Sequence, residues 1–330
     1  MKMIQDLLWH HYGIIAETVQ KLAIGAGSDT YVIHAGEHRF ILKNANANEA
    51  NHPENEPTLC DFLRSKGIPT SEFVKNLHGE YVTRFHGKDY LLQKYIPGET
   101  PPWNTASDVL LTQCAQMLGR IHKALEHYPA LPVGIGEGFF TFMTPNRAQE
   151  SYRKSLETAR VLGRSDIMRG IAYRIGLMER LFVPPIDISR LTCLNTHGDY
   201  FISNLICAGD EISGVIDWTT ACVHPAVWEI ARSYIYAAPE CAGGVINEER
   251  FLIYVRDYLQ HASLNDYDLA MLPWIFYYQI CVCDYYGQYF ASQADNREIY
   301  LQQAVLSTRL MPYFESNAEK LSQRLANGLA

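Results

Sequence analysis

The sequence lacks the features that mark membrane and nucleic-acid-binding chains. No apolar run approaches the ~18–20 residues that are needed to span a bilayer. Basic residues are in the minority, with 28 Lys and Arg against 36 Asp and Glu and a net charge of −8, whereas duplex-binding proteins are normally basic. No internal repeat, low-complexity tract or run of like charges occurs. We therefore expect no nucleic-acid partner and no membrane partner.

The sequence also lacks the cysteine spacing of a disulfide or zinc framework. Its eight cysteines are scattered along 330 residues, and disulfides are needed mostly by small domains. The one close pair, Cys281 and Cys283, has no second ligand pair at zinc-site spacing. The N-terminus carries Lys2, Asp6 and two histidines where a secretion signal would have an unbroken apolar segment. These observations predict free thiols and a cytoplasmic location.

The composition is that of a folded chain with room for two domains. Hydrophobic residues make up 48% of the sequence, and a domain usually takes ~100–200 residues. Short alternating segments up to residue 97, interrupted by one helix that ends at Gly67, predict a strand-rich domain. Pro97-Gly98 and Pro101-Pro102 mark its boundary. Beyond it, helical patterns cover 147–182, 225–238, 246–260 and 268–315. We predict an α+β fold with domains 1–97 and 98–330.

A β-like island at 193–220 interrupts the helical part and holds the most informative motif. It reads His197-Gly198-Asp199, then Asn204, then Ile216-Asp217-Trp218. Singly, such Asp and Asn residues usually form turns or helix caps. Together they supply what phosphoryl transfer from ATP requires. That chemistry needs one carboxylate beside an acceptor hydroxyl and a few oxygen ligands for Mg²⁺ on the phosphates.

This combination resembles the aminoglycoside phosphotransferase and choline kinase-like family, over roughly residues 10–235. The resemblance implies a bilobal protein-kinase-like fold that uses ATP with Mg²⁺. Its N-lobe is small and strand-rich with one main helix, and its C-lobe is larger and helical with a small β island. Asp199 would be the catalytic base, Asn204 and Asp217 would hold the metal, and His197 would shape the loop. The family often has Asp where this chain has Glu229, and this longer carboxylate could still hold the catalytic loop.

The N-terminal domain contains matching nucleotide-binding candidates. The apolar strand "RFILK" ends at Lys43, where a kinase has the lysine that pairs the α- and β-phosphates. Glu56 opens the following helix and would hold that lysine, with Glu54 as the competing residue. The glycine-containing segment around Ser28 could approach phosphate, although a tight hairpin uses the same residues. By resemblance, the adenine would bond to the carbonyl of Lys94 and the N–H of Ile96.

Residues 274–290 are the candidate acceptor-binding segment. They include eight aromatic residues, and a ring face attracts an ammonium group. Trp274, Tyr278, Tyr285 and Tyr289 are spaced 4, 7 and 4 residues apart, so they would share one helix face, with Asp284 among them. The acceptor-binding candidates are Trp274, Tyr278, Asp284 and Tyr285. From residue 199 onward, 16 acidic residues face seven basic ones, which favours a cationic acceptor. Ordinary core packing explains the aromatics equally well.

The sequence thus predicts an enzyme that transfers the γ-phosphate of ATP to a hydroxyl of a small molecule. An amine-bearing acceptor such as an amino alcohol, homoserine or an aminoglycoside-like antibiotic fits the charge. Two alternatives stay open, namely a protein Ser/Thr kinase of the same fold and a non-catalytic nucleotide-binding or spore-coat-like member. The segment after Asp217 is short for an activation loop, and the complete set of motif residues weighs against a loss of turnover.

Overall fold

The chain divides into two compact units, which are described separately. The computed structural model describes residues 1–22, 29–45, 52–134, 136–292 and 297–328. Unit 1 comprises Met1–Thr100 and Asn204–Thr220, and unit 2 comprises Pro101–Ser203, Ala221–Gln293 and Arg297–Ala330. This division lies after Thr100, whereas the sequence places a boundary between 97 and 98, and it groups residues 204–220 with unit 1.

Backbone pairing explains why part of the β island belongs to unit 1. The N–H of Glu99 donates to the carbonyl of Cys207 at 2.9 Å, and the N–H of Cys207 donates back at 2.8 Å. Gly98 has a φ of 134°, and a Cβ at this position would lie 2.6 Å from the carbonyl oxygen of Cys207. Only glycine allows this approach. The Pro-Gly turn that marked a boundary in the sequence is therefore also a packing contact within unit 1.

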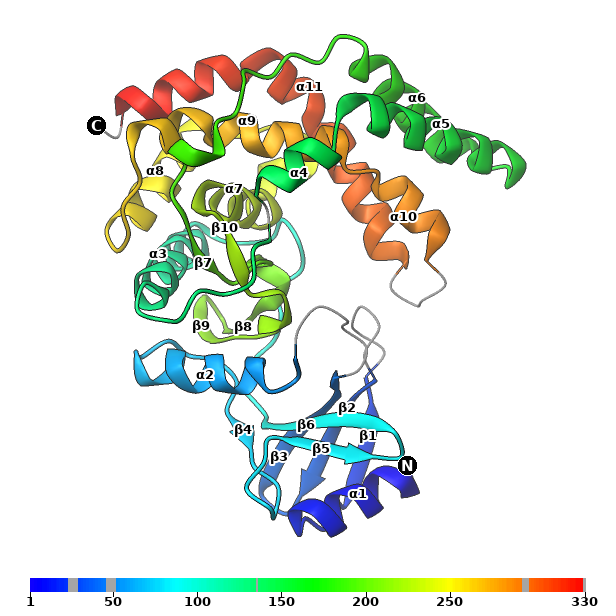
Figure 1. The fold of residues 1–330 in the computed structure, drawn as a ribbon, viewed down its shortest axis with the longest axis vertical. Helices are drawn as coiled ribbons and strands as arrows, with labels where there is room; N and C mark the ends of the chain where they lie inside the picture. Colours follow the sequence, from blue (N-terminus) through cyan, green and yellow to red (C-terminus); the bar gives the residue numbers. More distant parts are fainter. Residues whose placement is uncertain (23–28, 46–51, 135, 293–296, 329–330) are drawn as a thin grey trace. The chain divides into compact units, whose positions relative to one another are not determined.

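Unit 1 contains a six-stranded antiparallel sheet with helix α1 packed against it (Figure 1). A second helix, α2, carries Glu56. The strand order is β1-β2-β3-β6-β4, and β5 also pairs with β6. The elements are α1 (Lys2–Tyr12), β1 (Thr18–Lys21), β2 (Thr30–Ala35), β3 (His38–Asn44), α2 (Asn55–Ser65), β4 (Phe73–Val74), β5 (Val82–Phe85), β6 (Lys88–Lys94), β8 (Leu205–Ala208) and β9 (Glu211–Val215). Short 3₁₀ turns, η3 (Ile202–Asn204) and η4 (Trp218–Thr220), flank the β8–β9 hairpin.

The core of unit 1 forms where α1 packs on the sheet. Ile4, Leu7 and Leu8 recur at helical spacing and are at most 1% exposed. They pack against apolar side chains of β1, β2, β3 and β6. The helix ends at Gly13, whose φ of 67° is a left-handed conformation that glycine adopts easily. The predicted strands and helices of the first hundred residues are thus confirmed.

Unit 2 is predominantly helical. Its elements are α3 (Asp108–Leu125), α4 (Glu137–Phe142), α5 (Pro145–Val161), α6 (Ser165–Met178), η2 (Ile188–Arg190), β7 (Cys193–Thr196), β10 (Cys222–Pro225), α7 (Ala226–Ala237), η5 (Pro239–Gly243), α8 (Glu248–Leu259), α9 (Asp266–Val282), α10 (Tyr285–Ala291) and α11 (Arg297–Gly328). The β7 strand pairs with β10, so the predicted β island consists of two separate two-stranded sheets, one in each unit. The predicted α+β class, with a strand-rich and a larger helical part, is confirmed.

Two long helices expected from the sequence are wrong in their continuity. Residues 147–182 form α5 and α6, which are separated by Gly163 at a φ of 65°. Residues 268–315 form α9, α10 and α11. Cys283 and Asp284 leave the helical conformation, and the Asp284 carboxylate caps α10 by accepting the N–H of Gly287 at 2.8 Å. Apolar residues continue on both sides of Asp284, so periodicity could not reveal that break, whereas Gly163 followed by Arg164, Ser165 and Asp166 was a usable signal for the other.

Arg174 joins four helices of unit 2 from inside the core. The side chain is fully buried, and its partners are uncharged. The guanidinium donates to the hydroxyls of Thr308, Ser307 and Tyr152 and to the carbonyls of Ile280, Cys283 and Ala304. Ile280 lies in the last turn of α9, where carbonyls lack helical partners. Arg174 therefore satisfies the end of α9 at the point where the chain turns into α10.

Replacing Arg174 by Met should lower the free energy of unfolding by about 3 kcal/mol or more, because several buried carbonyls and hydroxyls lose their donors. Arg180→Met is the matched control, since Arg180 forms a half-exposed ion pair with Glu315 of the kind that contributes about 0–1 kcal/mol. Chemical denaturation of both variants measures the effect. Equal stabilities would show that Arg174 does not hold the helices together.

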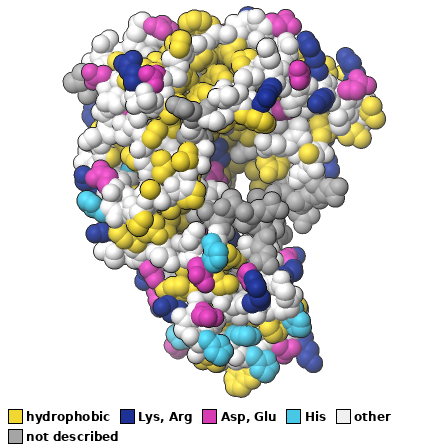
Figure 2. All heavy atoms as spheres, in the orientation of Figure 1, with side chains coloured by type: hydrophobic (Ala, Val, Ile, Leu, Met, Phe, Trp, Pro, Cys, Tyr) yellow, Lys and Arg dark blue, Asp and Glu magenta, His cyan; other side chains and the backbone are white. Residues whose placement is uncertain are grey.

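Charged side chains of both signs are mixed on the face drawn in Figure 2. They are interspersed over both units, and imidazoles gather on the strand-rich unit. Among the residues that the structure describes, no group of three or more His, Cys, Asp or Glu side chains is placed to hold a metal. A search of the same residues for a helix long and apolar enough to cross a membrane finds none.

Candidate active site

Lys43 lies between two carboxylates in unit 1. It is the penultimate residue of β3, and its Nζ is 2.8 Å from Oδ1 of Asp217 and 3.7 Å from Oε2 of Glu56. Burial lowers the pKa of Lys43, but the charges of Glu56 and Asp217 outweigh burial and raise the pKa above its ordinary value. The lysine is therefore a fixed cation. Lys43 thus contacts Glu56, the residue expected to hold it, and also Asp217, which is far away in the sequence.

The Asp217 side chain is the accessible member of this cluster. It is 46% exposed, whereas the Lys43 side chain is only 13% exposed. Asp217 has a φ of 64°, a left-handed conformation that costs a non-glycine residue free energy and is frequent at functional sites. The Thr219 hydroxyl donates to the same carboxylate oxygen that contacts Lys43, at 2.8 Å. Asp217 is thus held in one orientation with part of its carboxylate open to solvent.

Buried polar contacts fix the Asp217 turn to helix α2. The backbone N–H of Trp218 donates to Oε1 of Glu56 at 3.2 Å, so the same glutamate faces both Lys43 and the turn. The Trp218 indole donates to the Thr70 hydroxyl at 2.7 Å, and that hydroxyl donates to the carbonyl of Val215 at 2.6 Å. The cluster therefore depends on the α2 position, and Glu56, not Glu54, is the residue that contacts Lys43.

Asn204 lies next to the same turn. It ends η3, is 9% exposed, and its carbonyl accepts the N–H of Ile216 at 2.9 Å. Its amide and the Asp217 carboxylate are both in unit 1. Two such oxygen donors fit Mg²⁺, because this ion usually takes one or two protein oxygens and completes its shell with phosphates and water.

The other nucleotide-binding candidates are placed as follows. Ser28 lies outside the described residues. Lys94 ends β6, and its ammonium pairs with Glu72 at 2.6 Å. Ile96 packs against Gly214 of β9, where an added Cβ would lie 2.7 Å from the Ile96 side chain. Both residues are therefore in unit 1 with Lys43, and the predicted backbone contacts of Lys94 and Ile96 with adenine stay predictions.

Asp199 begins a turn in unit 2 and is paired with an arginine. Gly198, with a φ of 82°, reverses the chain before it, and Nδ1 of His197 accepts the N–H of Asp199 at 3.3 Å. Oδ1 of Asp199 is 2.7 Å from Nη2 of Arg232. The Asp199 side chain is still 35% exposed, so a small molecule can reach it. The arginine was not foreseen from the sequence.

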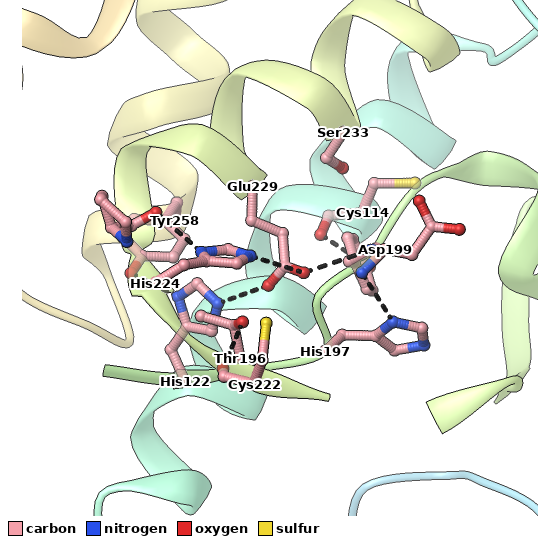
Figure 3. Close-up of polar contacts among 12 residues, drawn as sticks. Cys114, His122, Thr196, His197, Asp199, Cys222, His224, Glu229, Ser233 and Tyr258 are labelled. Atoms are coloured by element: carbon pink, nitrogen blue, oxygen red, sulfur yellow. Dashed lines mark hydrogen bonds and ion pairs between the residues drawn. The ribbon is translucent and has the colours of Figure 1, made fainter. Parts of the chain in front are cut away.

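Glu229 accepts a hydrogen bond from the backbone next to Asp199 (Figure 3). Its Oε1 accepts the N–H of Tyr200 at 3.2 Å, and its Oε2 accepts from Nε2 of His122 at 2.8 Å. Burial would raise the pKa of Glu229, but the hydrogen bond from His122 and the nearby His224 lower it to about 2. Nδ1 of His122 can then accept from the Tyr258 hydroxyl at 2.8 Å. The expected support by this longer carboxylate is thus present in the geometry.

The aromatic segment does not form the single helix face that the sequence suggested. Trp274 and Tyr278 lie on α9, whereas Tyr285 lies on α10 beyond the break at Asp284. The Asp284 carboxylate accepts from the hydroxyls of Ser151 and Ser155, both at 2.7 Å. Tyr278 donates to the carbonyl of Met143 at 2.6 Å. These contacts are typical of a packed core. Of the four candidates, only Tyr285 lies close enough to Arg232 to interact with its charge.

Three functional candidates escaped the sequence reading, namely Arg232, His122 and His224. Arg232 follows Glu229 by three residues, so the two share one face of α7. That spacing was a usable signal. His122 lies on α3 and His224 on β10, and nothing in the sequence connects them with Glu229.

Comparison with known proteins identifies the family. A sequence model of the phosphotransferase enzyme family matches residues 18–264. The chain belongs to this family. The match spans the Lys43 cluster, the Asp199 turn and helix α7, so all these residues lie in the part of the chain that defines a family phosphotransferase.

Two curated family relatives are homoserine kinases. The enzyme of Zymomonas mobilis subsp. mobilis is 23% identical over 235 residues, which cover 66% of this chain and 64% of that protein. The enzyme of Methylobacillus flagellatus is 25% identical over 217 residues, with coverages of 64% and 61%. The chain therefore spans a little under two thirds of the length of these relatives.

Solved structures share the fold over nearly the whole chain. An amicoumacin kinase in complex with AMP-PNP and Ca²⁺ has a TM-score of 0.60 at 16% identity, covering 97% of this chain and 93% of its own. A microcompartment-associated aminopropanol kinase has a TM-score of 0.61 at 14% identity, with coverages of 97% and 99%. At these identities the likeness shows that the phosphotransferase fold is shared.

Proposed function

We propose that this chain transfers the γ-phosphate of ATP to a hydroxyl group of a small molecule. The contact of Lys43 with Asp217 and Glu56 carries the proposal. A buried, permanently charged lysine beside a half-exposed carboxylate is suited to hold nucleotide phosphates and their metal ion. Family membership supports this use of the cluster.

In this proposal unit 1 binds the nucleotide. Lys43 pairs with the α- and β-phosphates, and Glu56 keeps its ammonium in place. Asp217 and Asn204 are the oxygen donors for Mg²⁺, which neutralises phosphate charge when bound. The carbonyl of Lys94 and the N–H of Ile96 receive the adenine, and Ser28 contributes a phosphate contact. Residues 1–97 would thus be the nucleotide-binding part, and 98–330 would carry the catalytic loop and the acceptor-binding helices.

Asp199 of unit 2 is the proposed base. Its carboxylate accepts the proton of the acceptor hydroxyl while that oxygen bonds to the γ-phosphorus. The bond between the γ-phosphorus and the β,γ-bridging oxygen breaks, and ADP leaves with the electron pair of that bond. Glu229 acts through the N–H of Tyr200, so it is a positioning residue for the loop.

The acceptor class is proposed from relatives and from charge. Homoserine kinases and an aminopropanol kinase, by their names, act on small amine-bearing alcohols. The acidic balance after residue 199 suits an ammonium group. Of the segment expected to bind it, Tyr285 is the best placed, whereas Asp284 already serves two hydroxyls and a helix cap.

A protein Ser/Thr kinase is the second candidate. A protein kinase of this fold would use the same catalytic and nucleotide-binding residues. A long regulated segment after Asp217 would favour this function. Only η4 and β10 separate Asp217 from α7, which begins at Ala226. This short connection favours a small acceptor over a phosphorylation-controlled protein kinase. A non-catalytic nucleotide binder remains the third outcome of the test.

The test is an ATP-consumption screen with Mg²⁺ over amino alcohols, hydroxy amino acids, sugars, aminoglycosides, macrolides and a generic protein. Asp217→Asn should lower turnover at least ~100-fold, because the metal and phosphates lose a charged ligand. Asp6→Asn, a change on an exposed turn of α1, should leave turnover unchanged. Turnover of the Asp217 variant within tenfold of the original chain would contradict the assignment. Nucleotide binding without turnover on any acceptor would favour the non-catalytic reading.

A further inference from the structure

Arg232 lies next to the proposed base, and the phosphotransfer steps above give it no role. The residue is 9% exposed and lies on α7, in contact with Asp199. Its Nη2 donates to Oδ1 of Asp199, and the rings of Phe201 and Tyr236 each lie 4.8 Å from the guanidinium carbon. Among the described residues, its Nε has no hydrogen-bond partner. A buried guanidinium therefore has one donor, the Nε–H, without a partner among the described residues.

The ion pair also restricts the work expected of Asp199. A base must present a carboxylate oxygen to the acceptor hydroxyl, and because Arg232 holds Oδ1 at 2.7 Å, only Oδ2 is left for this in the ion pair. Releasing Asp199 would leave a nearly buried cation without an anion, which is strongly unfavourable. An incoming ligand that carries its own anion would remove this cost, because it could replace Asp199 on the guanidinium.

We propose that Arg232 binds a carboxylate of the acceptor, so that the preferred acceptor is a hydroxy acid. The proposal rests on the phosphotransfer function above. The unpartnered Nε–H and the Nη2–H that Asp199 would release form a planar pair of donors, which matches a carboxylate in geometry as well as in charge. The carboxylate of the acceptor takes the place of Asp199 on Arg232, and the freed Asp199 receives the hydroxyl of the same molecule. A hydroxylated amino acid satisfies both this anion site and the acidic surroundings that favour an ammonium group.

Matched acceptor pairs test the proposal, because each pair differs only in the carboxylate. The pairs are serine with ethanolamine, threonine with 1-aminopropan-2-ol, and homoserine with 3-aminopropanol. For the original chain, kcat/KM should favour the acid of at least one pair by ~30-fold or more, as expected for a charge-assisted contact. Arg232→Gln should lower kcat/KM for the acid at least ~10-fold more than for the amino alcohol, so that the ratio of the two falls to about 3 or less.

Two further variants keep the test decisive. Arg232→Lys retains the charge without the planar fork, so it should retain an intermediate preference, and it serves if the Gln variant does not fold. Arg180→Gln removes an exposed arginine of the same unit and should leave every preference unchanged. Thermal melting establishes that each variant is folded.

The alternatives give different results. Equal losses on acid and amino alcohol in Arg232→Gln would mean that the arginine only positions Asp199 or contacts phosphate, and would overturn the proposal. Preference of the original chain for carboxylate-free acceptors would also overturn it, while phosphotransfer itself would stand. Absence of ATP consumption with every acceptor would instead reject the phosphotransfer function, and the acceptor proposal with it.

Discussion

Asp199→Asn is expected to lower phosphoryl transfer by about 10²–10⁴-fold while the chain stays folded. The amide cannot accept the hydroxyl proton, but its oxygen can still accept from Nη2 of Arg232, which lies 2.7 Å from Oδ1 in the original chain. Nucleotide binding should change little, because the Lys43 cluster belongs to the other unit. Single-turnover assays with Mg-ATP and the best acceptor measure the loss, and calorimetric titration with ADP measures nucleotide binding.

The matched control for this change is Asp266→Asn, an exposed position in the first turn of α9. It removes the same charge from the same unit and should leave turnover within twofold. If the Asp199 variant kept turnover within tenfold of the original chain, a different group would have to be the base. A loss of ADP binding together with turnover would indicate a folding defect, which melting of the variant would reveal.

Glu229→Gln is expected to have the second large effect, because it acts on stability and on turnover together. The carboxylate accepts two hydrogen bonds, one from Tyr200 N–H and one from His122. A glutamine has only one amide oxygen, so one buried donor then faces an NH₂ group. The free energy of unfolding should fall by about 2–4 kcal/mol, and turnover should fall at least ~10-fold because the residue after Asp199 loses its anchor.

The pH dependence of this effect has a defined sign. Glu229 has a pKa of about 2 in the folded chain, compared with an ordinary value of 4.5. A carboxylate with a lowered folded-state pKa stabilises the fold fully above its unfolded pKa, and this contribution is lost as the pH falls through the folded pKa. The stability difference between the original chain and Glu229→Gln should therefore be constant above about pH 5 and shrink from pH 4.5 toward pH 2.

Denaturant titrations at several pH values provide this comparison. Glu150→Gln, an exposed position on α5, is the control and should show no such trend. A stability difference that stayed constant down to pH 2 would mean that the ionised Glu229 carboxylate is not needed for the hydrogen bonds from Tyr200 N–H and His122. Unchanged turnover in a stable Glu229 variant would show that the N–H of Tyr200 needs no anchor.

The sequence by itself determined the class of fold and the set of chemical groups. Alternation against helical periodicity separated the strand-rich first hundred residues from the helical remainder, because side-chain burial repeats differently in the two structures. The Asp199, Asn204 and Asp217 spacing indicated phosphoryl transfer because few other reactions need an isolated carboxylate followed by two oxygen ligands. Lys43 at the end of an apolar strand completed this set.

Only the tertiary structure decided which of these groups meet and what restrains them. The Lys43–Asp217 contact joins residues 174 positions apart, and α2 selects Glu56 over Glu54 by its orientation. The break at Asp284 escaped detection because apolar and aromatic residues continue on both sides of it. His122 and His224 carry no local pattern of their own, and their roles follow from burial beside the Glu229 carboxylate. Such long-range partners are set by packing of separate elements, which local periodicity does not encode.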